Sequence, residues 1–236
     1  SMYFPAPTPM LRKMLIGLCL SYIVSMLAIR AGGGLWVTHL ELQYEAVLGG
    51  QVWRLASYSL LHEGVGHLIG NLLLFYFFGL DIEKQFGARR LLTVTIFCVI
   101  GGGVLASLSA LVGLSPSNPV IGASGGALGL LVCWCLVNAR RSIRLFGILP
   151  LTGMQLLYLS VGLEILLAVS PGGASSSATH LGGMITGWAL ITGAANPKRW
   201  RQKLRLASLR RKMKRSRKPN LNVIKGGKSK DDHWIN

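Results

Sequence analysis

Six runs of mostly apolar residues constrain this chain more than any other feature of its sequence. A helix that crosses a bilayer needs about 20 predominantly apolar residues, and each run approaches that length with few charges inside it. Charged residues make up only 14% of the 236 positions, against about a quarter in an ordinary soluble domain. The sequence therefore predicts an all-α polytopic membrane protein with six transmembrane helices, at residues 14–29, 65–80, 91–112, 121–137, 146–169 and 177–193.

The basic residues predict how these spans are oriented, because Lys and Arg are enriched in cytoplasmic loops. With the N-terminus in the cytoplasm, 23 of the 25 basic residues fall on the inner side, and only Arg30 and Arg54 fall outside. We therefore expect both termini in the cytoplasm. Residues 1–13 form a short N-terminal segment, residues 14–195 the membrane domain and residues 196–236 a basic tail.

The tail holds fifteen basic residues between Lys198 and Lys230, in a chain whose formal net charge is +17. A basic segment directly cytoplasmic of a span favours contact with anionic lipid, at about 1 kcal/mol per basic residue near the surface. Determination of topology alone would also account for the charge. Binding to RNA or DNA is a further alternative, but the tail lacks stacking aromatic residues and any recognisable motif. We expect lipid contact and no nucleic-acid partner.

The first outer loop, residues 30–64, is rich in aromatic residues. Trp36, Tyr44 and Trp53 lie among moderately apolar neighbours. This density is typical of a segment that lies in the membrane interface.

The four cysteines each lie inside an apolar run, where they are typical of small core residues. Their spacing indicates neither a disulfide framework nor a metal site. We expect no metal and no cofactor.

A glycine-rich segment with one serine lies near the outer end of the fourth span, in the order Gly122, Ala123, Ser124, Gly125, Gly126. Glycines beside a serine let another backbone approach its hydroxyl closely. Small residues also mark helix-packing faces throughout membrane proteins. The segment alone therefore fits packing as well as chemistry.

A histidine lies just inside the sixth span and shares a helical face with two glycines. His180, Gly183 and Gly187 follow one another at helical spacing, so this face suits close packing against another helix of small residues. Ser124 and His180 both lie about one turn below the outer surface. Equal depth on two closely packed helices is what a Ser–His nucleophile pair requires, with the histidine as general base.

Two further polar side chains enter the second span on one face. His67 and Asn71 are separated by four residues and therefore lie one turn apart. Donors at the outer end of a helix can stabilise an oxyanion by roughly 3–4 kcal/mol each. The alternative is a polar pair that hydrogen-bonds to neighbouring helices.

Together these features resemble the rhomboid family of intramembrane serine proteases. The resemblance covers residues 10–195 and rests on the order, spacing and helix assignment of separate motifs. The motifs are Trp53-Arg54, the segment from His62 to Asn71, the segment from Gly79 to Glu83, the segment from Gly122 to Gly125, and His180 with Gly183 and Gly187.

The resemblance implies a role for each of these residues. Ser124 would be the nucleophile and His180 its general base. The oxyanion hole would consist of the Ser124 backbone N–H and the side chains of His67 and Asn71. Structural support would come from Trp53, Arg54, His62, Glu83, Gly122, Gly125, Gly183 and Gly187.

The resemblance also implies what the protein acts on and where. Its substrates would be single-span membrane proteins, cleaved in their transmembrane segment near the outer leaflet. The substrate would enter laterally, past the fifth span and the 170–176 loop. A six-span body without a seventh helix resembles the bacterial type, which implies a multi-pass protein of the inner (plasma) membrane.

Two other functions compete with proteolysis. An inactive relative that binds or escorts membrane proteins keeps the fold but loses the serine or the histidine, and both are present here. A transporter with His67, Glu164 and His180 as a proton relay predicts inverted internal repeats, and the sequence shows no such symmetry.

How His180 is held is open at this point. No acidic residue is near it in sequence, and only Glu164 falls in a predicted span near its depth. We therefore expect a Ser–His dyad rather than a triad, and a protonated Glu164 that hydrogen-bonds to a neighbouring span. In the family a tyrosine commonly follows the serine by one turn and packs against the histidine, but here that position is Leu128.

Overall fold

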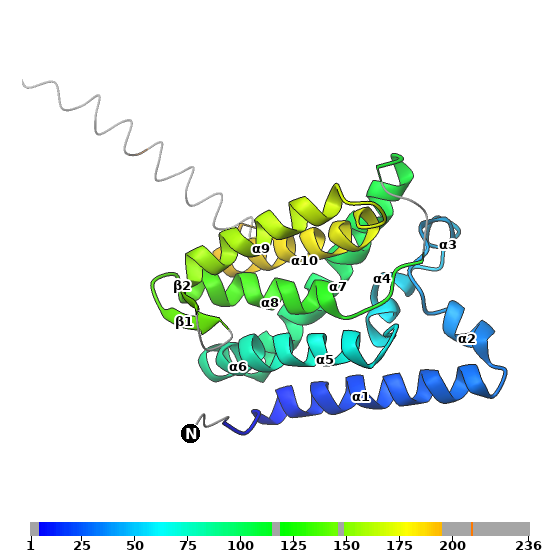
Figure 1. Ribbon diagram of the computed structural model, residues 1–236, viewed down its shortest axis with the longest axis horizontal. Helices are drawn as coiled ribbons and strands as arrows, with labels where there is room; N and C mark the ends of the chain where they lie inside the picture. The colour runs from blue at the N-terminus through cyan, green and yellow to red at the C-terminus, as the bar shows by residue number, and fades with distance from the viewer. Residues whose placement is uncertain (1–4, 115–118, 146–148, 195–208, 210–236) are drawn as a thin grey trace, which may run out of the picture. The chain divides into compact units, whose positions relative to one another are not determined.

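The computed structural model describes residues 5–114, 119–145 and 149–194, together with Leu209. All but Leu209 lie in one compact unit, Ser1–Ala195, which is built mainly of helices (Figure 1). The predicted basic tail lies outside the described residues, apart from Leu209. Within the described part, three helices are long and apolar enough to cross a membrane, Pro9–Arg30, Val65–Phe86 and Ala88–Leu111, and Ser124–Val137 and Gly153–Ala168 are shorter apolar helices.

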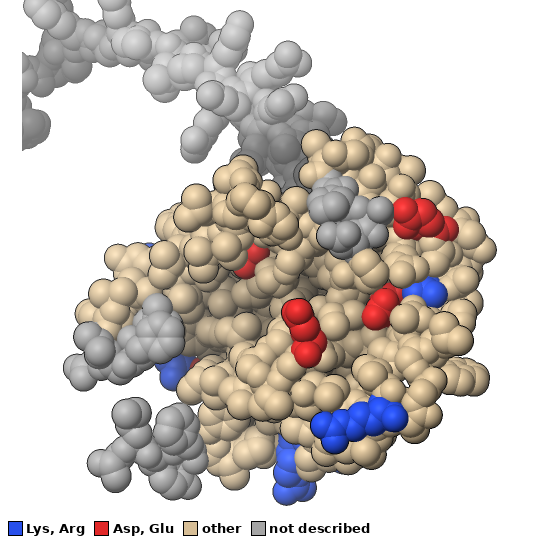
Figure 2. Space-filling view, turned by 45° about the vertical axis from the view of Figure 1, so that its right-hand side comes forward, with Lys and Arg blue, Asp and Glu red and all other residues tan. Residues whose placement is uncertain are grey.

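The surface of this unit fits a protein that lies in lipid. Figure 2 shows a face on which acidic and basic side chains form only isolated spots among uncharged residues. Many large apolar side chains are exposed, including Leu27 in the helix Pro9–Arg30 and Leu166 in the helix Gly153–Ala168. Contiguous exposed apolar surface is rare on soluble monomers, so the chain has the surface of a membrane protein.

The first two long helices are each longer than predicted. Helix α1 (Pro9–Arg30) starts with a proline in its first turn, where the missing N–H costs nothing. The second comprises α5 (Val65–Leu74), the π-helical turn η2 (Phe75–Gly79) and α6 (Leu80–Phe86). It ends at Gly87, whose φ of 82° favours glycine.

Helices α7 (Ala88–Leu111) and α8 (Ser124–Val137) follow. The prediction started the second of them three residues too early, at residue 121. Gly122 has a φ of 119°, which no helical residue adopts. The turn at Gly122 therefore makes Ser124 the first residue of α8.

The all-α prediction is wrong in one place. Strands β1 (Ser142–Leu145) and β2 (Leu149–Thr152) pair as an antiparallel hairpin where the fifth span was expected to begin. Helix α9 (Gly153–Ala168) starts only after the hairpin, because the Thr152 hydroxyl accepts a hydrogen bond from the Gln155 N–H and the Gln155 side chain accepts one from Thr152. This capping box fixes the start of the helix.

Helix α10 (Ala174–Thr192) packs against α7, α8 and α9, and Figure 1 shows α8, α9 and α10 running side by side. Gly193, with a φ of 70°, ends the helix in the left-handed conformation. The structure places α10 among the helices that carry the predicted site. Six complete membrane spans and the cytoplasmic side of each terminus stay predictions.

Glycines make the interface between α10 and its neighbours. A Cβ atom at Gly183 would collide with the carbonyl oxygen of Gly125, and one at Gly187 with that of Gly129. On the α7 side, a Cβ at Gly182 would lie 2.5 Å from the carbonyl oxygen of Gly101. The backbones of these helices therefore touch directly, as small residues allow in membrane proteins. We call the contact between α8 and α10 the glycine seam.

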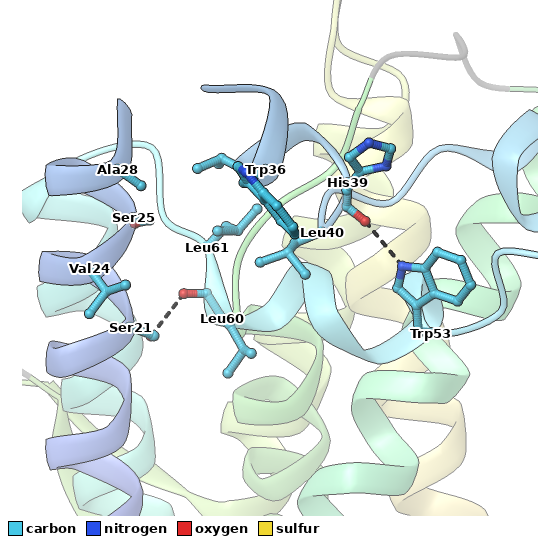
Figure 3. A pocket seen from close by; sticks show the side chains of 11 residues that line it. Ser21, Val24, Ser25, Ala28, Trp36, His39, Leu40, Trp53, Leu60 and Leu61 are labelled. Atoms are coloured by element: carbon cyan, nitrogen blue, oxygen red, sulfur yellow. Dashed lines mark hydrogen bonds between the residues drawn. The ribbon is translucent and has the colours of Figure 1, made fainter. Parts of the chain in front are cut away.

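The first outer loop folds into short helices rather than an extended segment. They are α2 (Gly34–Thr38), α3 (Tyr44–Leu48), α4 (Arg54–Ser57) and η1 (Tyr58–Leu60). Between this loop and α1 lies a pocket of about 550 Å³ with a nearly apolar lining, into which Trp36 and Leu40 face (Figure 3). Trp36 is 77% exposed. The predicted position of the loop in the membrane interface stays a prediction.

Candidate active site

The structure brings Ser124 and His180 together although 56 residues separate them. Ser124 is the first residue of α8, and His180 lies in the second turn of α10. The hydroxyl oxygen of Ser124 is 2.7 Å from Nε2 of His180. At this distance the imidazole can accept the serine proton directly.

The glycine seam explains why the two side chains meet. Gly125 immediately follows the serine, and Gly183 lies one turn after the histidine. These two glycines are in backbone contact, and the next pair along the seam repeats the contact. Because the helices have no side chains to separate them here, the serine and histidine in their N-terminal turns are within hydrogen-bonding distance.

His67 and Asn71 lie on α5, and the structure places His67 against the turn before the serine. A Cβ at Gly122 would be 2.6 Å from Cε1 of the His67 ring, so only glycine fits there. Asn71 is 2% exposed, and within the described residues its amide nitrogen has no hydrogen-bond partner. A buried donor without a partner is costly, which is typical of a group that binds a ligand or reaction intermediate.

A third donor is the backbone N–H of Ser124. As the first helical residue, Ser124 has an N–H group without a partner inside α8. This N–H carries the partial positive charge of a helix N-terminus. The site thus has a hydroxyl, an imidazole and unpaired donors on neighbouring helices.

His62 packs against His67. The two rings meet edge to face, with centroids 5.2 Å apart and an interplanar angle of 67°. His62 is 5% exposed, and this burial, together with the neighbouring His67, lowers the pKa of His62 to about 4. His62 is therefore neutral near pH 7 and acts as a packed ring beside His67.

Arg54 organises the first outer loop from inside it. Its guanidinium is 4% exposed and donates to the carbonyl oxygens of Thr38 at 2.7 Å and Glu41 at 2.6 Å, and to the Gln51 side chain. Trp53 beside it donates through Nε1 to the carbonyl oxygen of His39. These bonds hold the loop that precedes α5.

Glu83 lies near the C-terminal end of the long helix Val65–Phe86, away from the first outer loop. Its carboxylate accepts hydrogen bonds from the backbone N–H groups of Met10 and Leu11 and from the Thr8 hydroxyl. A carboxylate at a helix N-terminus satisfies orphan donors and complements the helix dipole. Glu83 therefore attaches α6 to the start of α1, and its described partners do not include Arg54.

Asp81 lies in the predicted motif from Gly79 to Glu83, which assigns it no function. Its carboxylate accepts from Nε1 of Trp134 at 2.8 Å and pairs with Arg141 at 2.7 Å. It thereby connects α6 to the end of α8. The sequence did not predict Trp134 and Arg141 as partners of Asp81, because both are more than fifty residues away along the chain.

The carboxylate that the predicted Ser–His dyad lacks is present in the structure. Oε2 of Glu164, on α9, is 2.9 Å from Nδ1 of His180. The predicted hydrogen bond from Glu164 to a neighbouring helix exists, but its partner is the candidate general base. The geometry is that of a Ser–His–Glu triad instead of the expected dyad. Leu128, whose position raised the question of how His180 is held, lies buried in the core.

The described residues contain no group of three His, Cys, Asp or Glu side chains that could hold a metal ion. The four cysteines are free thiols, three of them buried: Cys98, Cys133 and Cys135.

Comparison with known proteins identifies the family. A family model described as Rhomboid domain matches residues 49–196, more than half of the chain. The chain belongs to the rhomboid family. The matched rhomboid domain contains every predicted site residue and starts inside the first outer loop, so α1 precedes it. Family membership, predicted from the motifs, is confirmed.

Relatives of the chain occur among plants, animals and bacteria. It is 30% identical over 174 residues to RHOMBOID-like protein 4 of Arabidopsis thaliana, covering 70% of this chain and 38% of the relative. Identity to Rhomboid-related protein 2 of Mus musculus is 30% over 147 residues, covering 59% and 47%. Identity to Rhomboid protease GluP of Bacillus subtilis (strain 168) is 30% over 152 residues, covering 63% and 27%. The chain spans less than half the length of each of these rhomboid relatives.

Proposed function

We propose that this protein is an intramembrane serine endopeptidase that cleaves transmembrane segments of single-span membrane proteins near the outer leaflet. The observation that carries the proposal is the 2.7 Å contact between the Ser124 hydroxyl and Nε2 of His180, on two packed apolar helices. A nucleophile and base at this distance are the central requirement of acyl transfer. Ser124 is the nucleophile and His180 the general base.

The proposed reaction has two halves. Nε2 of His180 takes the serine proton as the serine oxygen attacks the scissile carbonyl carbon. The imidazolium then gives that proton to the leaving amine when the peptide C–N bond breaks, which leaves an acyl-enzyme. A water molecule, deprotonated by the same imidazole, hydrolyses the ester and restores the serine hydroxyl.

The oxyanion formed in each half would be stabilised by the Ser124 backbone N–H, a ring N–H of His67 and the Asn71 amide. The unpaired buried nitrogen of Asn71 supports this assignment, since its desolvation is recovered once an oxyanion accepts its hydrogen bond. The position of His67 against Gly122 puts its ring beside the turn that carries the serine.

The proposed substrate would reach the site laterally past α9. This helix buries only three of its sixteen residues, and Leu159, Leu163 and Leu166 on it are at least half exposed. A helix with so little packing separates from its neighbours at low cost. The segment at residues 170–176 would cover the site from outside, at the start of α10.

We place the protein in the plasma membrane as a multi-pass protein of six spans with both termini in the cytoplasm. The distribution of basic residues supports this orientation. The basic tail would contact anionic lipid, although it lies outside the described residues. A deletion of residues 198–230 that changes neither orientation nor affinity for anionic liposomes would contradict the proposed contact.

The alternative is an inactive rhomboid that binds or escorts membrane proteins. Such a protein needs the fold but not a serine–histidine contact. The hydrogen bond between Ser124 and His180 favours the enzyme.

Labelling by a serine-reactive fluorophosphonate in detergent tests the enzyme. We expect the wild type to be labelled, and Ser124→Ala and His180→Ala to be unlabelled. Ser160→Ala is the matched control, because among the described residues the Ser160 hydroxyl bonds only to the Leu156 carbonyl of its own helix. Its labelling should equal that of the wild type.

Cleavage of a fluorogenic transmembrane substrate, lost in Ser124→Ala, distinguishes the protease from an escort. A wild type that retains a membrane-protein partner during purification but is neither labelled nor active would favour the escort. Labelling of Ser124→Ala at the wild-type level would exclude Ser124 as the nucleophile.

A further inference from the structure

Glu164 is an unusual residue for its helix. Of the sixteen residues of α9, only Gly153, Leu156 and Glu164 are buried, and Glu164 is 6% exposed. The rest of the helix is largely apolar and faces outward. Glu164 thus places a carboxyl group at one of the few buried positions of α9. An apolar residue would pack at this position without the cost of burying a polar group.

A carboxyl group at membrane depth is costly unless it has a partner. The partner here comes from a neighbouring helix, since Oε2 of Glu164 lies 2.9 Å from Nδ1 of His180. His180 in turn lies 2.7 Å from the Ser124 hydroxyl through its other ring nitrogen. The three side chains form one line across α9, α10 and α8, with the imidazole in the middle.

This line decides which ring nitrogen of His180 carries the proton. A neutral imidazole has one N–H and one lone pair. When Glu164 is ionised, its carboxylate accepts only, and it then holds the proton on Nδ1 and leaves the lone pair on Nε2, which faces the serine. If Glu164 donated a proton to Nδ1 instead, Nε2 would carry the N–H and could not take the serine proton.

The same carboxylate would stabilise the charge that develops during the reaction. When Nε2 accepts the serine proton, the ring becomes an imidazolium with N–H groups on both nitrogens. The negative charge 2.9 Å from Nδ1 favours this form, in an environment of low dielectric where such an interaction is strong. The proton on Nδ1 stays where it is throughout.

We propose that Glu164 is a positioning residue that completes a Ser124–His180–Glu164 triad inside the membrane. It selects the reactive tautomer of His180 and stabilises its protonated form. This inference rests on the proposed endopeptidase function. It makes α9, the helix of the predicted fifth span, part of the catalytic machinery as well as the proposed entry side.

The groups that face His180 come from three helices. Glu164 lies on α9 and contacts Nδ1, Ser124 lies on α8 and contacts Nε2, and His67 on α5 lies against the turn before the serine. Among these three side chains, Glu164 is the one that can carry a negative charge.

The test compares Glu164→Gln with the wild type in the full chain, using fluorophosphonate labelling and cleavage of the transmembrane substrate. The amide has the same size but no charge, and it can donate to Nδ1 and so select the wrong tautomer. We expect kcat to fall by about 10⁴-fold, as when the carboxylate of another triad is replaced by its amide, with KM unchanged. The acidic limb of the rate–pH profile should move to lower pH, because the imidazolium loses its neighbouring charge.

Two further variants separate positioning from folding. Glu164→Asp keeps the charge on a shorter side chain, so its activity should lie between those of the wild type and Glu164→Gln, with the acidic limb near that of the wild type. Ser160→Ala, one turn earlier on α9, should keep the wild-type rate and pH profile. Thermal melting in detergent should show all three variants folded at the assay temperature.

The outcomes distinguish the two proposals. If the wild type is reactive and Ser124→Ala is not, but Glu164→Gln keeps the wild-type kcat and pH profile, the role of Glu164 is overturned and the protease stands. A fall in kcat without movement of the acidic limb, accompanied by a lower melting temperature, would make Glu164 merely structural and also overturn it. If the wild type is as unreactive as Ser124→Ala, the protease fails, and the triad fails with it.

Discussion

Helices α8 and α9 are of similar length and similarly apolar, but they occupy opposite kinds of environment. Eleven of the fourteen residues of α8 are buried, whereas α9 buries three of sixteen. The difference lies in the small residues, because α8 has glycines that let α10 approach to backbone contact and α9 has leucines that face outward. Apolarity therefore identifies both segments as membrane helices, and the glycines of α8 identify it as the helix that is buried among others.

The comparison extends to the site. The serine–histidine contact depends on the glycine seam, where the backbones of α8 and α10 are in direct contact. A larger side chain in the seam would push these two helices apart. The glutamate contact depends on a single side chain from a lightly packed helix. The two halves of the proposed triad should therefore differ in their tolerance to substitution.

The largest expected effect is that of a methyl group placed in the seam. In Gly183→Ala the new Cβ would collide with the Gly125 carbonyl, so α8 and α10 must move apart. We expect a loss of about 3 kcal/mol in the free energy of unfolding and no detectable fluorophosphonate labelling of Ser124. Denaturation in detergent with increasing SDS measures the first quantity. Wild-type stability and labelling in this variant would show that the seam does not set the serine–histidine distance.

The donor side of the site comes next. Asn71→Ala removes an amide whose nitrogen has no partner in the described structure, so stability should change little while kcat falls by about 100-fold. Asn138→Ala is the matched control, because that amide bonds to the Trp134 carbonyl at the far end of α8. Cleavage of the transmembrane substrate measures the effect. Equal activity of the two variants would remove Asn71 from the oxyanion hole.

The sequence predicted the seam side of the site better than the α9 side, for a physical reason. His180, Gly183 and Gly187 share one helical face by spacing alone, and that face is the one that meets α8. The helix α9 is apolar on all sides, so no periodicity shows which residue points inward. The hairpin at the start of the predicted fifth span also shifted its first helical residue to Gly153.

The same limit applies to partners that are distant in sequence. The π-helical turn at Phe75–Gly79, the attachment of Glu83 to the start of α1 and the contact of Glu164 with His180 all depend on how separate helices pack. Motif spacing indicated Ser124, His180, His67 and Asn71 as site residues without this information, because glycines accompany each of them in the sequence. No such motif accompanies Glu164, so the sequence did not show that its hydrogen-bond partner is His180.

His62, which packs against His67, should make the stability of the protein sensitive to acid. The pKa of His62 is lowered to about 4 in the folded protein, so between about pH 6.5 and pH 4 the unfolded chain binds a proton at this position and the folded one does not. His62 therefore has almost no effect on stability above about pH 6.5, and its protonation in the unfolded chain lowers the free energy of unfolding as the pH decreases toward 4. From pH 7.5 to pH 5 this group should lower the free energy of unfolding by at most about 2 kcal/mol.

His62→Gln removes this group, so the variant should lose less stability over that pH range than the wild type, whatever its stability at pH 7.5. Melting temperatures in detergent at the two pH values provide the comparison. A wild type and variant that lose the same number of degrees would show that another group is responsible for the acid sensitivity.

The smallest expected effect is the counterpart of the seam substitution on α9. Gly162 lies in the middle of that helix, and a Cβ there would meet nothing within 4 Å. Because alanine has the higher helix propensity, Gly162→Ala should raise the free energy of unfolding by about 0.5–1 kcal/mol, with labelling of Ser124 unchanged. The same chemical change thus destabilises the protein at position 183 and stabilises it at position 162. If both variants lost stability equally, the packing difference between the two helices would not govern how the membrane domain is held together.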